Sequence, residues 1–404
     1  MSDDARPLIQ KMGPRRSQRF FNHPFGDLPA DRSFVLVQTL EAPCERIRLV
    51  YTNDCPRPYQ VTSAAIAMAQ EGSAQVFWSP VTFNAAGQDL PAPSPPGDIR
   101  TLEVPGALNP ERPVLVYSDW IAPLGGGAQA SRLPVLICRS FLAQGGRTVI
   151  PLAANLASFN AEPSHFGRQI WGFNQPGDAV DATASLSDAQ PHPFIVPYMV
   201  QIIGQLSGAT LFCVGDSLTT GQGGTSQHSP WGIRAAARLS RPDRPVSFVN
   251  AGSSGQVSAD FLANGAAQLA AIAPEITCIA LYSPNNVFQR DASAATADAA
   301  YYAALELGKT VRQAGGVVVL STPLPWVSAS ADHHKIRQGI VDRVRALGAA
   351  GVPVLDFDRA VSTGGERPGL RAEFDSGDGL HPNDAGYAAM TEEAVVVLGK
   401  IIEG

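Results

Sequence analysis

The sequence is poor in charged residues and has no surplus of basic ones. Only 16% of its 404 residues are Asp, Glu, Lys or Arg, and the formal net charge is −6. Because phosphate groups are bound by clustered lysine and arginine side chains, this balance argues against nucleic acid as a partner. An apolar fraction of 45% predicts a compact folded protein and not a disordered one.

Long hydrophobic runs are also missing. The most apolar stretch, 194–203, is interrupted by Pro197 and Gln201, so no segment predicts a membrane-spanning helix. The first residues, Met1-Ser2-Asp3-Asp4, are acidic and are not followed by the apolar core of a signal peptide. We therefore expect no membrane partner and a cytoplasmic location.

Five cysteines are present, and their spacing does not match a metal site. Cys138, Cys213 and Cys278 lie inside apolar runs, where a small buried side chain is the usual role. Cys44 and Cys55 flank a predicted strand, and an oxidising compartment would allow them to pair. We leave that pairing open.

The pattern of apolar residues divides the chain into two parts. Short alternating runs with Pro, Gly, Asn and Asp between them predict strands at 34–40, 46–51, 76–78, 114–117 and 133–141. Many short strands with turns predict a jelly-roll-like β-sandwich domain over 30–204, after an N-terminal arm at 1–29. The polar, poorly periodic segment 153–192 is expected to be irregular and is a candidate flap over a binding site.

From residue 205 to 404, strand-like and helix-like patterns alternate. Fully apolar runs predict parallel strands covered on both faces, at 211–214, 246–249, 276–281, 317–320 and 352–355. One helical stripe comprises Ala300, Ala303, Leu307 and Val311, and Asn383 is a candidate N-cap of the last helix. These patterns predict a three-layer α/β/α domain of flavodoxin-like type, with its ligand at the carboxyl ends of the strands.

A serine stands where the first of these parallel strands ends. Ser217 follows the apolar run within Gly215-Asp216-Ser217-Leu218, and a glycine-rich loop at 221–224 comes next. A tight turn of this kind exposes the hydroxyl, which becomes a strong nucleophile only when a base removes its proton. Taken alone, the tripeptide Gly215-Asp216-Ser217 also fits an ordinary turn with a capping aspartate.

Asp378 and His381 supply a base and a group that orients it. At a spacing of i and i+3 in a turn, the carboxylate can accept the imidazole Nδ1–H while Nε2 faces a third group. A surface Asp and His before a helix would have the same spacing, but that interpretation does not explain the coincidence with Ser217. We predict that folding brings the three side chains within hydrogen-bonding distance.

Two further segments follow the next strands along the chain. Residues 250–255, Asn-Ala-Gly-Ser-Ser-Gly, come after the second apolar run, and Asn285 and Asn286 come after the third. A glycine lets a backbone N–H approach a substrate closely, and an asparagine amide supplies another donor for an oxyanion. Each segment alone also fits ordinary turn chemistry.

These four segments, in this order, resemble the sequence blocks of the SGNH (GDSL-type) hydrolases. Residues 215–218 are similar to the nucleophile block, 250–255 to the second block, and 374–387 to the Asp-x-x-His block. The third block departs from the usual Gly-x-Asn-Asp, because this chain has Ser283-Pro284-Asn285-Asn286, so either asparagine could point inward. The N-terminal half resembles the β-sandwich that precedes this domain in a bacterial subset.

The resemblance implies a serine-dependent carboxylic ester hydrolase that forms an acyl-enzyme. Ser217 would be the nucleophile, His381 the base and Asp378 the residue that orients His381. The oxyanion would be held by the Ser217 and Gly255 backbone N–H groups and by the Asn285 side chain. No cofactor and no metal ion would be required.

The expected partner is a small-molecule or carbohydrate ester, with small acyl or acetyl groups as candidates. An α/β-hydrolase is disfavoured because the sequence has no Gly-x-Ser-x-Gly elbow. Two alternatives stay open, namely an acyltransferase that uses the same triad and a carbohydrate-binding protein with a vestigial hydrolase domain. The sequence does not indicate an oligomeric state.

Overall fold

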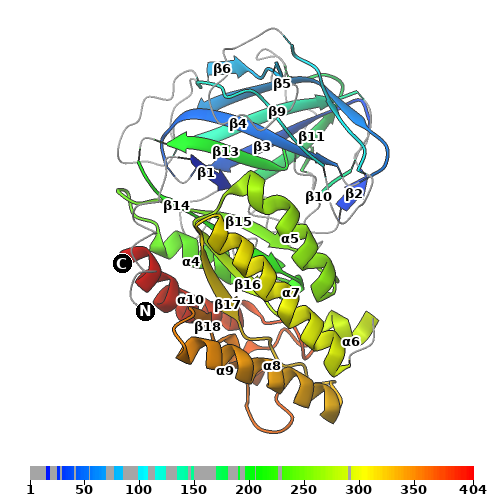
Figure 1. Ribbon diagram of the computed structural model, residues 1–404. Coiled ribbons are helices and arrows are strands. Elements are labelled where there is room, and N and C mark those ends of the chain that lie inside the picture. The colour runs from blue at the N-terminus through cyan, green and yellow to red at the C-terminus, as the bar shows by residue number, and fades with distance from the viewer. Residues whose placement is uncertain are drawn as a thin grey trace.

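A computed structural model of the chain describes residues 15–18, 25–27, 30–40, 42–53, 55–69, 77–84, 99–107, 114–123, 134–143, 147–149, 170–180, 190–191, 196–204, 206–225, 230–289 and 293–404. The N-terminal part is built from antiparallel sheets, and the C-terminal part from a parallel sheet covered by helices (Figure 1).

The largest N-terminal sheet has the strand order β12-β11-β3-β9-β5-β6, with β7 also pairing with β5. Its strands are β3 (Arg32–Thr39), β5 (Tyr59–Ala69), β6 (Phe77–Pro80), β7 (Leu102–Val104), β9 (Val135–Leu142), β11 (Ile170–Pro176) and β12 (Gln190–Pro191). Every pairing in this sheet is antiparallel.

A second sheet has the order β1-β13-β4-β8, and β10 pairs with β2 in a two-stranded sheet. The bounds are β1 (Arg15–Gln18), β2 (Phe25–Asp27), β4 (Cys44–Asn53), β8 (Val114–Tyr117), β10 (Arg147–Val149) and β13 (Met199–Gly204). Within the predicted N-terminal arm, β1 and β2 thus pair with later strands, so these residues belong to the sheets and not to a free arm.

The two larger N-terminal sheets share an apolar core. Ile47, Leu49 and Tyr51 alternate along β4 and are buried in the same cluster as Phe34 and Leu36 of β3. Two sheets that bury one face of each against the other form a β-sandwich. The predicted sandwich is therefore confirmed.

Several N-terminal strands were not predicted from the sequence, among them β11 and β5. The segment 153–192 contains β11, because Ile170-Trp171-Gly172-Phe173 favours a strand and pairs along the length of β3. Most of that segment, including the candidate flap, lies outside the described residues. The long strand β5 was not predicted, since its several alanines are weak strand formers.

The C-terminal sheet is wholly parallel and has the order β15-β14-β16-β17-β18. Its strands are β14 (Ala209–Gly215), β15 (Val246–Gly252), β16 (Ile276–Ala280), β17 (Val317–Ser321) and β18 (Val354–Leu355). All residues of β14 and β15 are buried, as expected for a sheet covered on both faces. This order confirms the predicted flavodoxin-like topology.

Helices cover both faces of this sheet and complete the predicted three layers. One face packs against α4 (Trp231–Leu239), α9 (Phe357–Val361) and α10 (Asp384–Glu403), and the other against α5 (Ser258–Ile272), α7 (Ala294–Gln313) and α8 (Ala331–Ala349). The short elements α3 (Ser217–Thr220), α6 (Asn285–Gln289) and η1 (Ala372–Phe374) belong to the connecting loops. Among the described helices, none has the combination of length and apolarity needed to cross a membrane.

The helix patterns read from the sequence are close to the observed ones. The buried stripe of α7 runs through Ala300, Ala304, Leu307 and Val311, whereas Ala303 is exposed, because a period of 3.6 residues places position 304 on the inner face. Asn383 caps α10 by accepting the N–H groups of the second and third residues of that helix.

A buried polar contact joins the sandwich to helix α5. Arg48, 1% exposed, places its guanidinium over the rings of Tyr117 and Trp120, at 4.5 and 4.6 Å from their centroids. Its Nε donates to Gln201 Oε1 at 2.7 Å, and Gln201 Nε2 donates to the Ala271 carbonyl near the end of α5 at 2.9 Å. The sandwich therefore holds the helix that follows the second motif segment.

We propose a domain boundary near residue 205, with a sandwich domain over 30–204 to which β1 and β2 add strands, and a hydrolase-like domain over 205–404. Antiparallel pairing ends with β13, and parallel pairing begins with β14. All five cysteines are free thiols, including Cys44 and Cys55, for which pairing had been left open.

Candidate active site

Ser217 lies where the inner strand β14 ends. Asp216 caps the one-turn helix α3 by accepting the N–H of Leu218 at 2.9 Å, and Gly221 closes it with a φ of 93°. Glycine adopts this left-handed backbone conformation readily, because it has no Cβ atom to clash with the backbone. The turn places Ser217, 4% exposed, at the carboxyl edge of the sheet.

The three side chains predicted to act together form a continuous hydrogen-bond chain. Ser217 Oγ lies 2.9 Å from His381 Nε2, and His381 Nδ1 lies 2.6 Å from Asp378 Oδ2. Ser217 and Asp378 are 161 positions apart in the chain, so this contact depends on the fold and not on local sequence. The structure thus brings the three residues together.

A tightly bonded turn holds Asp378 and His381. Asp375 Oδ1 accepts the N–H groups of Gly377 at 2.9 Å and Gly379 at 3.0 Å. Both glycines have positive φ values, 107° and 71°, which other residues adopt only with strain. The two glycines therefore allow the sharp reversal that turns Asp378 back toward His381.

The Asp378 carboxylate is stabilised by several donors. Burial on its own would raise its pKa, but hydrogen bonds from the His381 ring and from the backbone N–H groups of His381 and Leu380 outweigh this effect. The net result is a pKa below the ordinary value of an aspartate. The carboxylate is therefore ionised at neutral pH and holds the imidazole with its Nδ1 protonated.

The second motif segment packs against the nucleophile turn. Ser253 N–H donates to the Gly215 carbonyl at 2.9 Å, and the hydroxyls of Ser254 and Thr220 are 3.0 Å apart. Gly255 follows with a φ of 78° and is exposed. The predicted oxyanion glycine thus lies in a loop bound directly to the strand that carries Ser217.

The two asparagines of the third segment have different environments. Asn285 Nδ2 donates to the carbonyl of Gln256 at 3.0 Å, so this side chain faces the residue next to Gly255. Asn286 is 3% exposed, and its Oδ1 accepts both the N–H and the hydroxyl of Ser258, at 3.0 and 2.8 Å. The Asn285 side chain thus faces the end of the second motif segment, and the Asn286 side chain faces the start of α5.

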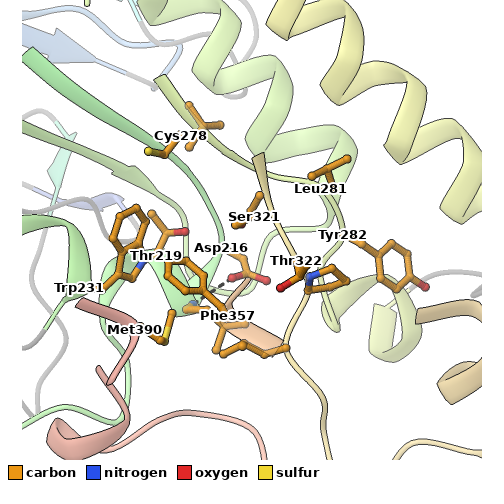
Figure 2. Close-up of a pocket in the computed structure, with 15 residues that line it drawn as sticks. Asp216, Thr219, Trp231, Cys278, Leu281, Tyr282, Ser321, Thr322, Phe357 and Met390 are labelled. Carbon is orange, nitrogen blue, oxygen red and sulfur yellow. Dashed lines mark hydrogen bonds between the residues drawn. The ribbon is translucent and has the colours of Figure 1, made fainter. Parts of the chain in front are cut away.

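Asp216 is buried beside a small cavity. Burial raises the pKa of its carboxyl above the ordinary value, although a hydrogen bond from Ser283 and one from the Leu218 N–H oppose this effect. The cavity of about 30 Å³ is lined by Asp216 together with Thr219 and Thr322 (Figure 2). That volume accommodates one or two water molecules.

Two neighbours of the site were not predicted from the sequence. Tyr387 donates its hydroxyl to the Gln222 carbonyl at 2.8 Å and so ties the glycine-rich loop to α10. Ser283 bonds Asp216 and the backbone of Asn285. The glycine-rich loop could have pointed to a partner such as Tyr387. The serine in place of the usual glycine of the third block could have pointed to Ser283.

The described residues contain no group of three or more His, Cys, Asp or Glu side chains that could hold a metal ion. The side chains that the structure brings together at the site are a hydroxyl, an imidazole and a carboxylate. A serine aligned with an imidazole that is itself aligned with a carboxylate suits acyl transfer.

Comparison of the sequence with family models identifies one match. Residues 213–389 match the GDSL-like lipase/acylhydrolase family, a range that begins inside β14 and ends inside α10. Among curated proteins, no sequence matches this chain.

Solved structures that are similar to part of this chain include three bacterial proteins of low sequence identity. A member of the lipolytic protein G-D-S-L family from Veillonella parvula has 20% sequence identity and a TM-score of 0.37, and the alignment covers 47% of this chain and 98% of that chain. The esterase EstA from Pseudoalteromonas sp. has 16% identity and a TM-score of 0.39, with 48% of this chain and 100% of that chain covered. A family 3 carbohydrate esterase from Clostridium thermocellum has 18% identity and a TM-score of 0.38, with 49% of this chain and 98% of that chain covered. Each aligns with about half of this chain and with nearly all of its own.

Proposed function

We propose that the protein is a serine-dependent carboxylic ester hydrolase that works through an acyl-enzyme, and the match of residues 213–389 to the GDSL-like lipase/acylhydrolase family supports this proposal. The observation that carries this proposal is the hydrogen-bond chain from Ser217 Oγ through His381 to Asp378. A hydroxyl within 2.9 Å of an imidazole nitrogen is within reach for direct proton transfer.

In the acylation step, Ser217 Oγ attacks the ester carbonyl and its proton passes to His381 Nε2. Because Asp378 holds Nδ1–H, Nε2 is the unprotonated nitrogen that can accept this proton. The imidazolium is stabilised by the ionised Asp378 and then protonates the leaving alkoxide. Water, activated by the same imidazole, attacks the acyl-enzyme and releases the acid and Ser217.

The oxyanion of each tetrahedral intermediate would be held by the Ser217 N–H, the Gly255 N–H and the Asn285 side chain. Support comes from the packing of the segments that carry these donors. Ser253 is bonded to the strand end before Ser217, and Asn285 is bonded to Gln256, the neighbour of Gly255. Donors fixed in this way before the reaction stabilise the developing charge without reorganisation.

We propose esters with small acyl groups, acetyl included, as the substrate class, with a small molecule or a carbohydrate as the alcohol. The match of residues 213–389 to the GDSL-like lipase/acylhydrolase family supports acyl esters as the substrate class. The Asp378 side chain is 50% exposed, so the end of the triad that lies away from Ser217 is open to solvent.

The test is a panel of p-nitrophenyl esters of increasing acyl length together with acetylated sugars. Wild type is expected to hydrolyse the short esters, and Ser217→Ala to lose about four to six orders of magnitude in kcat. Ser247→Ala is the matched control, because it removes another buried serine hydroxyl, which lies near the start of β15 and not at the carboxyl edge of the sheet.

The outcome is read from the comparison of the two variants. Near-normal turnover by folded Ser217→Ala would refute the serine mechanism, and absence of any Ser217-dependent hydrolysis would refute the proposed function. Repeating the assay with an added alcohol or sugar acceptor measures whether the acyl group goes to the acceptor instead of to water. Predominant transfer would identify an acyltransferase.

A further inference from the structure

We propose that Ser283 is the positioning residue that fixes the three oxyanion donors relative to one another. This inference rests on the proposed function, because it concerns how the same site is assembled. Ser283 stands where the family block usually has glycine, and its side chain is fully buried, with 0% exposure. A hydroxyl at this position therefore has a specific set of neighbours that glycine cannot contact.

The first contact of Ser283 reaches the nucleophile turn. Its Oγ–H donates to Asp216 Oδ2, while Asp216 Oδ1 accepts the Leu218 N–H at 2.9 Å. Asp216 directly precedes Ser217, so the bond fixes the peptide whose N–H is the first proposed oxyanion donor. A hydrogen bond to a buried carboxylate is among the stronger kinds in a protein.

The second contact reaches the asparagine donor. Ser283 Oγ accepts the backbone N–H of Asn285 at 3.1 Å. The Asn285 side chain then donates to the Gln256 carbonyl at 3.0 Å. The hydroxyl of Ser283 thus sets the direction in which the main chain of Asn285 leaves β16, and with it the place of the side-chain amide.

The third contact reaches the glycine segment. The same Gln256 carbonyl lies 3.3 Å from Ser283 Oγ, and Gln256 directly follows Gly255. The hydroxyl has one hydrogen, which the carboxylate of Asp216 holds more strongly, so this contact is the weaker of its two donor contacts. One side chain therefore touches all three segments that carry the proposed donors.

A second buried serine supports the position of Ser283 itself. Ser258 Oγ accepts the Ser283 N–H at 3.0 Å and donates to Asn286 Oδ1 at 2.8 Å. Both residues that depart from the usual third block, Ser283 and Asn286, are thus part of one buried hydrogen-bond network. Fully satisfied networks of this kind rigidify the backbone that they join.

The experiment compares Ser283→Ala with Ser247→Ala, which removes a fully buried hydroxyl from β15 without touching the site. Ser283→Ala is expected to lower kcat about 10- to 100-fold, because small displacements of aligned groups cost this much. KM is expected to change less than about threefold, since the donors act mainly in the transition state. Ser247→Ala is expected to leave both constants unchanged.

A double variant separates positioning from general destabilisation. If Ser283 acts through the donors, the loss of kcat in Ser283→Ala/Asn285→Ala will be clearly smaller than the product of the losses in the two single variants. Independent, multiplicative losses would overturn the proposal, as would a Ser283→Ala enzyme with wild-type kcat. If Ser283→Ala does not fold, Ser283→Thr and Ser283→Val, which share a shape and differ in the hydroxyl, replace it, and equal turnover by the two would overturn the proposal.

A readout that needs no turnover keeps this inference separate from the proposed function. In ¹H–¹⁵N NMR spectra, Ser283→Ala is expected to shift or broaden the Gly255 N–H and Asn285 side-chain signals, and Ser247→Ala is not. An inactive wild type would refute the proposed function alone. Unchanged Gly255 and Asn285 signals in Ser283→Ala would refute the positioning role, whatever the activity.

Discussion

Gly223 and His381 approach each other so closely that no side chain fits between them. A Cβ atom at Gly223 would lie 2.9 Å from the Cβ of His381 and 2.6 Å from the carbonyl oxygen of Pro382. Real Cβ atoms essentially never come this close to another heavy atom. The glycine-rich loop after Ser217 therefore packs directly against the backbone that carries the imidazole.

Substitution of Gly223 is expected to damage turnover by moving His381. Gly223→Ala should lower kcat about 10- to 100-fold, since the imidazole would leave its alignment with Ser217. The measurement is kcat for a short p-nitrophenyl ester, with a circular-dichroism melt to verify folding.

Gly365→Ala is the control for Gly223→Ala. Gly365 also has a positive φ, 85°, but a Cβ atom there would meet nothing within 4 Å. Both substitutions cost about 1–2 kcal/mol of backbone strain, and only one disturbs the imidazole. Equal kcat values for the two variants would contradict the packing argument.

Asp378→Asn tests the group that orients the imidazole. An asparagine amide at this position favours the wrong tautomer, because Nδ1 would then accept a hydrogen bond and Nε2 would carry the proton. We expect kcat to fall about 10³- to 10⁴-fold while the protein stays folded. Asp384→Asn removes a carboxylate from the same segment and should change kcat by no more than about twofold. A comparable loss of kcat in both variants would contradict the role assigned to Asp378.

Substitution of each asparagine of the third motif segment is expected to have a different effect, one on turnover and the other on stability. Asn285→Ala should lower kcat about 10²- to 10³-fold with little change in stability, as removal of an oxyanion donor does. Asn286→Ala should instead lower the free energy of unfolding by about 1–3 kcal/mol, because it leaves buried donors of Ser258 without their acceptor. Urea titration and kcat together distinguish the two, and a stable but inactive Asn286→Ala would show that the roles are reversed.

The pH dependence of stability tests the burial of Asp216. Burial raises its pKa in the folded protein, so the folded state holds this proton more tightly than the unfolded state does. The contribution of Asp216 to stability is therefore greatest below the ordinary aspartate pKa of about 4 and is lost as pH rises through the raised value. In the Asp216→Asn variant the side-chain amide does not ionise, and its oxygen can still accept the capping bond from the Leu218 N–H.

It follows that the melting temperature of Asp216→Asn, relative to wild type, should increase as pH rises from about 4 to 8. Scanning calorimetry at several pH values measures this difference directly. A difference that stays constant across the range would mean that Asp216 ionises as easily in the folded protein as in the unfolded chain.

Much of the fold could be predicted because buried parallel strands have a simple signature. Each predicted apolar run forms a strand of the parallel sheet, although the last shrinks to Val354–Leu355. Strand β5 was missed because Ala64, Ala65 and Ala67 give little contrast between its faces, and its burial comes from pairing with β9. Tertiary pairing, which a local pattern does not contain, decides such segments.

The site likewise has features that local sequence predicts and contacts that it does not predict. The spacing of Asp378 and His381 in a turn is a local property, so their mutual hydrogen bond could be predicted. The contacts of Ser283 with Asp216 and of Gly223 with His381 join segments far apart in the sequence, and no local spacing encodes them. The different environments of Asn285 and Asn286 depend on Ser258, which lies in another helix, so the local sequence does not encode them.

The most direct test of the whole account is to identify the residue that a serine-reactive fluorophosphonate modifies. Attack by Ser217 Oγ on phosphorus would expel fluoride and leave a stable phosphonyl group, with the hydroxyl proton passing to His381. Peptide mapping by mass spectrometry is expected to find this group on Ser217 in step with loss of esterase activity, and to find no such adduct in Ser217→Ala. Modification of a different residue as activity is lost, or full activity with Ser217 modified, would contradict the account.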